Sequence, residues 1–260
     1  MASTAANYDL DLKLAELKIN GYTMFEDLLS AEKMDRLHNA FMPILGAVKD
    51  RDDPIESGDR RTGEGRRQNV NRYTVEVPWL APFADPEIYE NPVILELLER
   101  YWETSDFVMV LYSSNNPYPG SEYQHWHRDM PLIGGVQKCP IFGLKFPLVD
   151  TSEENGSFEV LPGTQFLNYP EYEGRYDEIV EAGDFPKHRL NMRRGTFWIQ
   201  DVRPFHRGTP NRSDHARPEL VICYSLPWYK DRRHVEMTQD NFDALSDRAK
   251  ELLANCRIIP

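Results

Sequence analysis

The chain has 260 residues and a formal net charge of −12, from 42 acidic and 30 basic side chains. A balance this acidic repels phosphate backbones, which argues against nucleic acid as a partner. Hydrophobic residues make up 40% of the chain, enough for the core of one large domain, and no stretch nears the roughly 18 apolar residues that a membrane span needs.

The three cysteines, Cys139, Cys223 and Cys256, are far apart and odd in number. This spacing favours neither a disulfide framework nor a zinc knuckle, and it suits the reducing cytoplasm, where we expect the protein. The N-terminal residues lack the basic and apolar regions of a signal peptide. We expect a monomer or homodimer that acts on a small molecule and has no membrane partner.

The first 105 residues are expected to be mostly helical support. Leucines spaced along residues 10–17 precede Gly21, which predicts a short amphipathic helix and its end. Ser30 is a suitable N-cap for a second helix, and Asp85 with Pro86 begins a third. The apolar faces of the second and third helices are Met34, Leu37, Phe41, Ile44 and Val48, and Ile94, Leu97, Leu98 and Tyr101.

Residues 51–72 form a polar segment between the second and third predicted helices. The segment is rich in Gly, Asp and Glu, and its arginines include Arg60, Arg61, Arg66, Arg67 and Arg72. This composition predicts an exposed loop. Two interpretations are open: a solvated loop, or a lid that meets an anionic group of the substrate.

From residue 106 to residue 230 the pattern changes to short β-prone runs separated by turn signals such as Asn116-Pro117. The predicted strands are 107–112, 123–130, 141–149, 158–161, 196–199 and 220–226. Several short strands of this kind predict a sandwich, barrel or jelly roll, so the expected fold class is mainly β with flanking helices. The last segment, 231–260, is expected to hold a helix that Asp240 caps.

The most informative segment is Gln124-His125-Trp126-His127-Arg128-Asp129. Alternate side chains of a strand share a face, so His125, His127 and Asp129 would point the same way. Two of them could bind one metal ion, with His206 as a third ligand from a distant strand. Two histidines and one carboxylate leave three coordination positions open, an arrangement associated with Fe(II) oxygenases. On geometry alone, His125 could replace His127.

Arg217 lies eleven residues after His206, beyond the polar turn 208–213 and before the apolar strand 220–226. A hairpin of this length would bring Arg217 back towards the level of His206. Its guanidinium could hold a carboxylate through two parallel hydrogen bonds, which lysine cannot do. The pattern therefore indicates a metal site with an adjoining place for the carboxylate of a keto-acid co-substrate.

Taken together, these motifs resemble the phytanoyl-CoA dioxygenase family of Fe(II)/2-oxoglutarate oxygenases. The similarity covers most of the chain, at residues 19–22 with 28–30, 124–129, 154–164, and 206–209 with 217. The resemblance implies a double-stranded β-helix, or jelly-roll, core in a single domain spanning residues 1–260. It assigns the iron to His127, Asp129 and His206, in preference to His125, and the distal carboxylate of 2-oxoglutarate to Arg217.

The resemblance also implies further co-substrate contacts, with departures from the family pattern. A serine is common two residues after the distal histidine, but Gly208 stands there, and Thr209 follows as the candidate contact. Lys145 takes a position that is aromatic in some members, and it could pair with 2-oxoglutarate or point outward. Tyr112 and Ser114 lie on a strand that often flanks the co-substrate.

The activity that the resemblance implies is oxidation of a C–H bond in a small secondary metabolite, with release of succinate and CO2 and with ascorbate as reductant. Hydroxylation is the default outcome, and Asp129 disfavours halogenation because related halogenases have a small residue there. Candidates to line the substrate pocket are Gln68, Asn71, Tyr73, Trp79 and Trp228. The alternatives are a metal-free binding protein and an isomerase or hydrolase that uses another divalent metal.

Overall fold

The structure is a computed structural model that describes residues 8–49, 70–131, 133, 136, 138–230 and 233–260. The first elements are α1 (Leu10–Asn20), β1 (Tyr22–Phe25), α2 (Ala31–Lys49), β2 (Arg72–Thr74), α4 (Pro86–Tyr89) and α5 (Pro92–Trp102). The central elements are β3 (Val108–Pro117), β4 (Ile141–Pro147), β5 (Phe158–Val160), two 3-10 turns (Thr164–Phe166 and Pro170–Tyr172), α6 (Tyr176–Ala182), β6 (His188–Leu190), β7 (Phe197–Asp201), β8 (His206–Arg207) and β9 (Glu219–Ser225). The last elements are β10 (Glu236–Thr238), α7 (Gln239–Asp243), α8 (Asp247–Leu252) and β11 (Arg257–Ile259).

Local signals explain where the N-terminal helices begin and end. Gly21 ends α1 with a φ of 77°, which glycine adopts without strain, and Ser30 caps α2 as predicted. The predicted third helix is wrong in one respect, because it is two helices, α4 and α5. Pro92 lacks the N–H that would continue α4, and the Asn91 side chain accepts hydrogen bonds from the first amides of α5.

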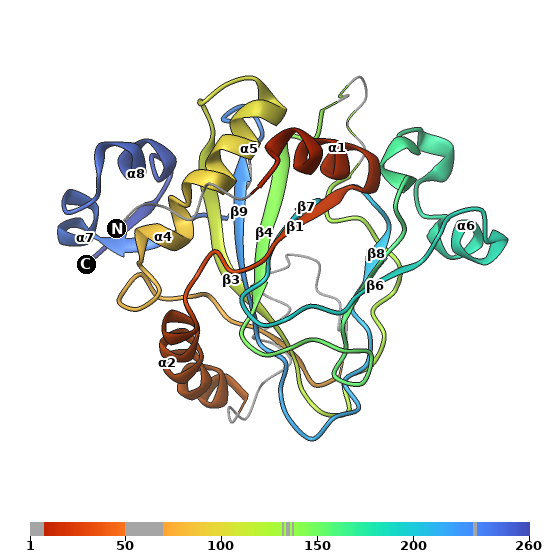
Figure 1. Ribbon diagram of the computed structural model, residues 1–260, viewed down its shortest axis with the longest axis horizontal. Coiled ribbons are helices and arrows are strands. Elements are labelled where there is room, and N and C mark those ends of the chain that lie inside the picture. Colours follow the sequence, from red (N-terminus) through yellow and green to blue (C-terminus); the bar gives the residue numbers. More distant parts are fainter. Residues whose placement is uncertain (1–7, 50–69, 132, 134–135, 137, 231–232) are drawn as a thin grey trace.

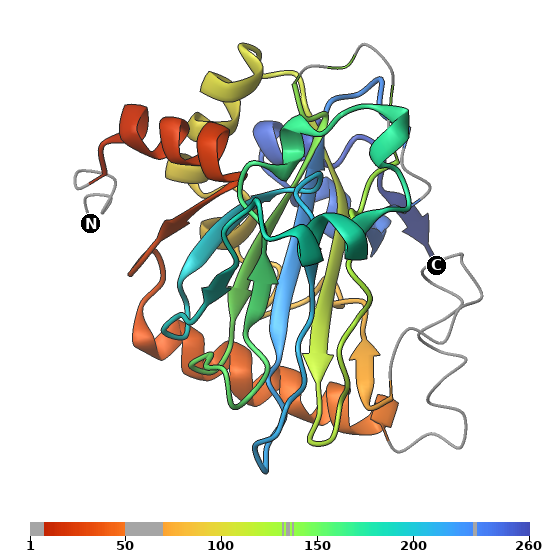
Figure 2. The same cartoon turned by 90° about the vertical axis from the view of Figure 1, so that its right-hand side faces the viewer.

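The strands form a six-stranded sheet in the order β1-β7-β4-β9-β3-β2 and a three-stranded sheet in the order β6-β5-β8, with neighbours antiparallel. Helices α2, α4 and α5 lie on one side of the large sheet, and the small sheet lies on the other (Figure 1). Figure 2 shows the small sheet and α6 in front of the large sheet. The prediction of a mainly β fold with flanking helices is confirmed. The N-terminal region adds more than helical support, because it supplies both edge strands of the large sheet.

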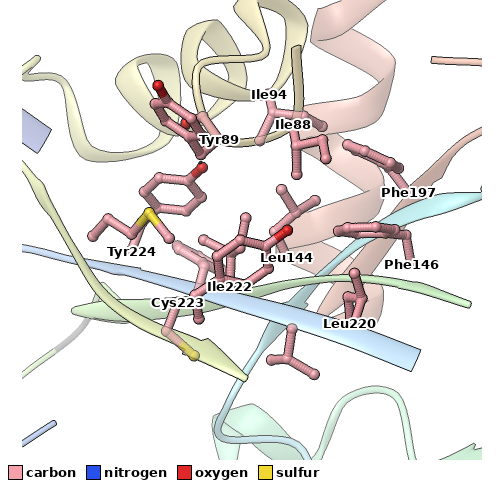
Figure 3. Close-up of a cluster of buried hydrophobic side chains, with 14 of the residues drawn as sticks. Ile88, Tyr89, Ile94, Leu144, Phe146, Phe197, Leu220, Ile222, Cys223 and Tyr224 are labelled. Carbon is pink, nitrogen blue, oxygen red and sulfur yellow. Dashed lines mark hydrogen bonds between the residues drawn. The ribbon is translucent and has the colours of Figure 1, made fainter. Parts of the chain in front are cut away.

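One apolar layer fills the space between the large sheet and its helices. Figure 3 shows Ile94 of α5 packed over this layer, to which Leu144 and Phe146 of β4 belong. Phe146 stacks on Phe197, with 4.6 Å between ring centroids. Because alternate residues of a strand face opposite ways, Lys145 must face the other side, towards the small sheet. The helices therefore close one face of the sheet and leave the other for a site.

The segment 123–130 is not a strand, contrary to the prediction. It meets β8 in a single bridge, in which His127 and His206 exchange backbone hydrogen bonds of 3.1 and 3.0 Å. A regular antiparallel ladder would next pair Asp129 with Pro204, which has no N–H to donate, so the ladder stops there. The bridge alone is enough to bring the His-x-Asp pair against His206.

The predicted C-terminal helix is also two helices, α7 and α8. Thr238 caps the first of them, and the Ser246 side chain accepts a hydrogen bond from the Ala249 amide to begin the second. Strands β10 and β11 pair in parallel beside these helices. Within the described part of the chain, none of the helices combines the length and the apolar character that crossing a membrane requires.

A Gly156→Ala variant is expected to be less stable than the parent by about 2 kcal/mol. Gly156 has a φ of 86°, and a Cβ there would come within 2.8 Å of the Thr209 carbonyl oxygen, so backbone strain and a steric clash add. Gly174→Ala is the matched control, because Gly174 has a φ of 77° but nothing within 4 Å, and it should lose about 1 kcal/mol. Urea denaturation measures the unfolding free energy of both variants. Equal losses of unfolding free energy would contradict the steric contribution at Gly156.

Candidate metal centre and co-substrate pocket

The three predicted iron ligands meet at the start of β8. The ligating atoms of His127, Asp129 and His206 all lie within 4.8 Å of one another. His127 Nε2 is 3.5 Å from Asp129 Oδ1, and His206 Nε2 is 3.3 Å from Asp129 Oδ2. Within the described ranges, His125 is exposed and does not join this group. The geometry thus groups His127, and not His125, with Asp129 and His206.

Backbone carbonyls orient both imidazoles. His127 Nδ1 lies 2.8 Å from the His125 carbonyl oxygen, and His206 Nδ1 lies 2.8 Å from the Pro204 carbonyl oxygen. In the tautomer with the proton on Nδ1, each histidine donates to its carbonyl, and its Nε2 lone pair is available to a metal ion. Imidazoles held in this tautomer are already arranged to bind a metal ion.

The pKa shifts of two of the three side chains favour a metal, and that of His127 opposes it. Partial desolvation would raise the pKa of Asp129, but the positive charge of protonated His206 and hydrogen bonds from both histidines hold that pKa well below its ordinary range. Burial lowers the pKa of His206, which favours the neutral form that binds a metal ion. Burial also acts to lower the pKa of His127, but the hydrogen bond and charge of Asp129 outweigh it and raise that pKa. The ionised Asp129 and the lowered pKa of His206 favour metal binding, whereas a metal ion would have to displace a proton from His127.

Aromatic rings and a lysine line the space next to His206. The Phe158 ring stacks on the His206 imidazole, with 5.1 Å between centroids. Lys145 Nζ lies 4.7 Å from the centre of the Phe158 ring and 4.8 Å from that of Trp198. Gln200 Oε1 accepts a hydrogen bond from Lys145, and Gln200 Nε2 is 3.2 Å from His206 Nδ1. Lys145 is therefore buried beside the triad and does not point outward.

Glu219 joins Arg217 to this cluster. Glu219 Oε1 accepts a hydrogen bond of 3.1 Å from Trp198 Nε1 and lies 3.7 Å from Arg217 Nη1. All three side chains are buried, and Arg217 Nε has no hydrogen-bond partner among the described residues. Burial lowers the pKa of Arg217, although Glu219 opposes the change. A buried guanidinium with an unused donor is a place that a ligand carboxylate can complete.

Arg72 also belongs to this cluster, although the sequence places it in the basic loop. Arg72 Nη2 donates to the Thr209 carbonyl oxygen at 2.8 Å, and Arg72 Nε is buried without a partner among the described residues. Burial and the nearby charge of Arg217 lower the pKa of Arg72 to about 9. One sequence signal could have found this residue: the β-prone run 73–75 directly after it predicts that Arg72 begins a strand.

This donor set fits Fe(II) and a 2-oxo dicarboxylate. Two imidazole nitrogens and a carboxylate oxygen are typical of an open Fe(II) site, whereas closed zinc sites commonly use thiolates, and no cysteine joins the group within the described ranges. The unused Nε donors of Arg72 and Arg217 are suited to carboxylate oxygens. The residues present therefore fit both the metal and the co-substrate that the sequence predicts.

Tyr112 and Ser114 are not brought together with the triad, contrary to the expectation. They pair with Ile222 and Leu220 of β9, which face the helix layer in Figure 3. The Tyr112 hydroxyl donates to the Phe83 carbonyl oxygen, and the Ser114 hydroxyl donates to the Val75 carbonyl oxygen. Because paired residues share a face of the sheet, both side chains lie on the side away from Lys145.

Thr209 lies close to the cluster, but its hydroxyl already has partners. The hydroxyl donates to the Ser157 carbonyl oxygen at 2.7 Å and accepts a hydrogen bond of 2.9 Å from Arg189 Nη2. The side chain is fully buried. The contribution of Thr209 to the pocket in this structure is its backbone carbonyl, which accepts the hydrogen bond from Arg72.

The predicted substrate-pocket residues lie in different surroundings. Trp79 is buried in the helix-side core, and Tyr73 of β2 is also buried. Asn71 is exposed, and Trp228 is 53% exposed, so both are free to meet solvent or a ligand. Gln68, like most of the predicted polar loop 51–72, lies outside the described residues.

Solved structures share this fold at low sequence identity. AviO1 from Streptomyces viridochromogenes Tue57 has a TM-score of 0.59 at 19% identity, over 87% of this chain and 99% of that chain. HygX from Streptomyces hygroscopicus, solved with nickel, 2-oxoglutarate and hygromycin B, has a TM-score of 0.61 at 13% identity, over 88% and 92%. SnoK, a non-haem α-ketoglutarate-dependent carbocyclase from nogalamycin biosynthesis, has a TM-score of 0.62 at 16% identity, over 86% and 87%.

The sequence itself matches a family model over well more than half of its length. Residues 17–218 match the model described as phytanoyl-CoA dioxygenase (PhyH). The matched range contains all three candidate iron ligands and Arg217. The resemblance that the motifs indicate is therefore confirmed, and this chain belongs to the phytanoyl-CoA dioxygenase (PhyH) family.

Proposed function

We propose that this protein is a non-haem Fe(II)- and 2-oxoglutarate-dependent oxygenase that oxidises a C–H bond of a small organic molecule, with release of succinate and CO2. The observation that carries the proposal is the convergence of two imidazole nitrogens and a carboxylate, from His127, His206 and Asp129, near a buried arginine with an unused donor. The proposal includes a single domain on a double-stranded β-helix core. It also places the enzyme in the cytoplasm, which the free cysteines support, with ascorbate as reductant.

Each residue has a distinct role in this proposal. The triad holds the metal from one side and leaves three positions for the keto-acid and O2. Bound iron supplies the oxidising chemistry, and the protein supplies position and electrostatics. Arg217 holds the distal carboxylate and so fixes the keto-acid relative to the metal. Asp129 fills the position that a halide would need, which disfavours halogenation.

Lys145 and Thr209 support the co-substrate in different ways. The Lys145 ammonium is buried between two aromatic rings beside His206, where it adds positive charge close to the metal ligands. Its hydrogen bond to Gln200, which also contacts His206, links that charge to a ligand ring. Thr209 acts through its backbone, because its hydroxyl is held by Ser157.

Hydroxylation of a secondary metabolite is the proposed outcome, and product mass tests it. Among structural neighbours, SnoK is named a carbocyclase and SnoN an epimerase, so related folds host other oxidative outcomes. A screen for succinate release against a metabolite library would identify the substrate. Gain of one oxygen atom in the product would support hydroxylation, whereas loss of two hydrogens would contradict it in favour of desaturation or ring closure.

An anaerobic titration separates the oxygenase from the two alternative classes. Adding Fe(II) and 2-oxoglutarate to the metal-free protein should produce the weak visible band of a chelated keto-acid. A metal-free binding protein would give no band, and an isomerase or hydrolase that uses another metal would release no succinate after O2 is admitted. The absence of both signals at saturating Fe(II) and 2-oxoglutarate would contradict the proposed function.

An Arg217→Met variant is expected to bind 2-oxoglutarate roughly 10- to 100-fold more weakly, because hydrogen bonds to charged groups contribute about 1.5–3 kcal/mol. Isothermal titration of the nickel-loaded protein measures this without turnover. Arg217→Lys is the matched control, since it keeps the charge but loses the planar fork, and its affinity should be intermediate. Because Glu219 loses its ion-pair partner, thermal denaturation should first show that each variant is folded. Parent affinity in the folded Met variant would contradict the role of Arg217.

A further inference from the structure

A second arginine, Arg72, lies beside the same residue of β3 as Arg217 does. Arg72 begins β2 and pairs with Pro117 at the end of β3. The Arg217 N–H donates to the Pro117 carbonyl oxygen at 3.0 Å from the other side. The two arginines therefore flank Pro117 on neighbouring stretches of chain. Because laterally paired residues share a face of a sheet, their guanidinium groups point to the same side.

Backbone oxygens, and no carboxylate, hold the Arg72 guanidinium in the described structure. Nη2 donates to the Thr209 carbonyl oxygen at 2.8 Å and to the Glu122 carbonyl oxygen at 3.4 Å. Nη1 lies 2.7 Å from the point that a Cβ of Gly208 would occupy. The missing side chain of Gly208 thus makes room for the guanidinium, two residues from the metal ligand His206.

Positive charge exceeds negative charge in this cluster of side chains. Glu219 is the carboxylate that acts on both arginines, and it lies 3.7 Å from Arg217 Nη1. Lys145 adds a third cation, since its Nζ lies against Trp198, which hydrogen-bonds the same Glu219. Like charges repel strongly where water is excluded, so an added anion would stabilise the arrangement. The buried Nε of each arginine is available to such an anion.

We propose that Arg72 is a second anchor for the distal carboxylate of 2-oxoglutarate and forms a two-arginine clamp with Arg217. The inference rests on the proposed function and deepens it by naming a positioning residue for the co-substrate. A carboxylate has two oxygen atoms, so each can accept from a different guanidinium. A negatively charged group of the substrate is a less favoured ligand than the co-substrate carboxylate. Arg72 and Arg217 lie beside the same residue, Pro117, and both are close to Glu219, so one carboxylate can meet both.

The test compares two ligands that differ only at the distal end. 2-Oxopentanoate has the chain length of 2-oxoglutarate but a methyl group in place of the distal carboxylate. Isothermal titration of the nickel-loaded protein should show Arg72→Met binding 2-oxoglutarate roughly tenfold to a hundredfold more weakly, with 2-oxopentanoate affinity unchanged. Arg175→Met removes an exposed arginine that pairs with Glu178 on the surface, so it should change neither affinity.

Gly208→Ala tests the same contact with Arg72 still present. The added Cβ would meet the Arg72 guanidinium and the Gln124 side chain, so it should displace the clamp and weaken 2-oxoglutarate binding selectively. If Arg72→Met fails to fold, the affinity of Gly208→Ala for 2-oxoglutarate tests the clamp instead.

Three results would overturn the inference. If Arg72→Met and Gly208→Ala bind 2-oxoglutarate as tightly as the parent, the inference is wrong and the proposed function stays intact. Equal losses for both oxo acids would also overturn the inference, because Arg72 would then support the pocket without contacting the carboxylate. A parent protein that binds no 2-oxoglutarate would overturn the inference together with the proposed function.

Discussion

A His206→Ala variant is expected to bind Fe(II) about 100-fold more weakly than the parent, or worse, since even loss of an outer-shell partner costs 10- to 100-fold. Succinate release from 2-oxoglutarate should disappear with the metal. His206 is the least exposed of the three ligands, at 3% of its side chain against 28% for His127 and 45% for Asp129. Its ring is held by the Pro204 carbonyl and stacks on Phe158. Anaerobic titration with Fe(II) and a succinate assay measure both effects.

His125→Ala is the matched control for this experiment. His125 lies on the same segment as the ligands, is exposed, and contacts His127 only through its backbone carbonyl, which the substitution keeps. Metal affinity and succinate release should therefore stay at parent levels. His127→Ala should instead lose both. If His127→Ala kept full succinate release while His125→Ala lost it, the assignment of the triad would be wrong.

The convergence of the candidate iron ligands could be predicted because their chemistry leaves a local pattern. His127 and Asp129 are two residues apart, and His206 with Arg217 repeats a spacing that the family pattern contains. The predicted strand that would bring them together is wrong, since residues 123–130 do not form a strand. A single bridge to His206 is sufficient, because a metal site needs the side chains at one point and not a continuous ladder.

The position of Arg72 in the cluster could not be predicted from the sequence. Its place in the pocket depends on the pairing of β2 with β3, some forty residues further along the chain, and on the absent side chain of Gly208. Both are tertiary facts that composition cannot reveal. Within the polar segment 51–72, nothing local distinguishes Arg72 from the arginines before it except the β-prone residues that follow.

The face of a strand residue also depends on register, which one irregularity can shift. A β-bulge between Met109 and Leu111 changes the alternation of β3, and Tyr112 and Ser114 lie on the helix side after it.

The surroundings of Trp79 could not be predicted from the sequence either. An aromatic residue in a loop suits a core or a pocket equally well by composition, and here Trp79 packs on Tyr89 with 4.8 Å between ring centroids.

An Arg203→Met variant is expected to lose about 3–5 kcal/mol of unfolding free energy, because it would leave Asp201 buried without its partner. Arg203 Nε lies 2.9 and 3.1 Å from the two Asp201 carboxylate oxygens, and Nη2 lies 2.6 Å from Oδ2. Burial would lower the pKa of Arg203, but the hydrogen bonds and charge of Asp201 outweigh it and raise that pKa. The carbonyl of Val202, between the two, accepts the Asp129 amide at 3.0 Å, so the loss should also disturb the metal site. Urea denaturation measures the stability.

The double variant Asp201→Leu, Arg203→Met separates an unpaired charge from lost packing. Removing both partners leaves no buried charge, and replacing a buried ion pair by apolar side chains of similar volume is often neutral or stabilising. The double variant should therefore be markedly more stable than Arg203→Met alone, although the Arg203 amide loses its bond to the Asp201 carboxylate. A double variant as unstable as the single one would contradict the charge argument. It would indicate instead that the shape of this pair, which lies at the end of β7 and leads into the turn before His206, holds His206 in place.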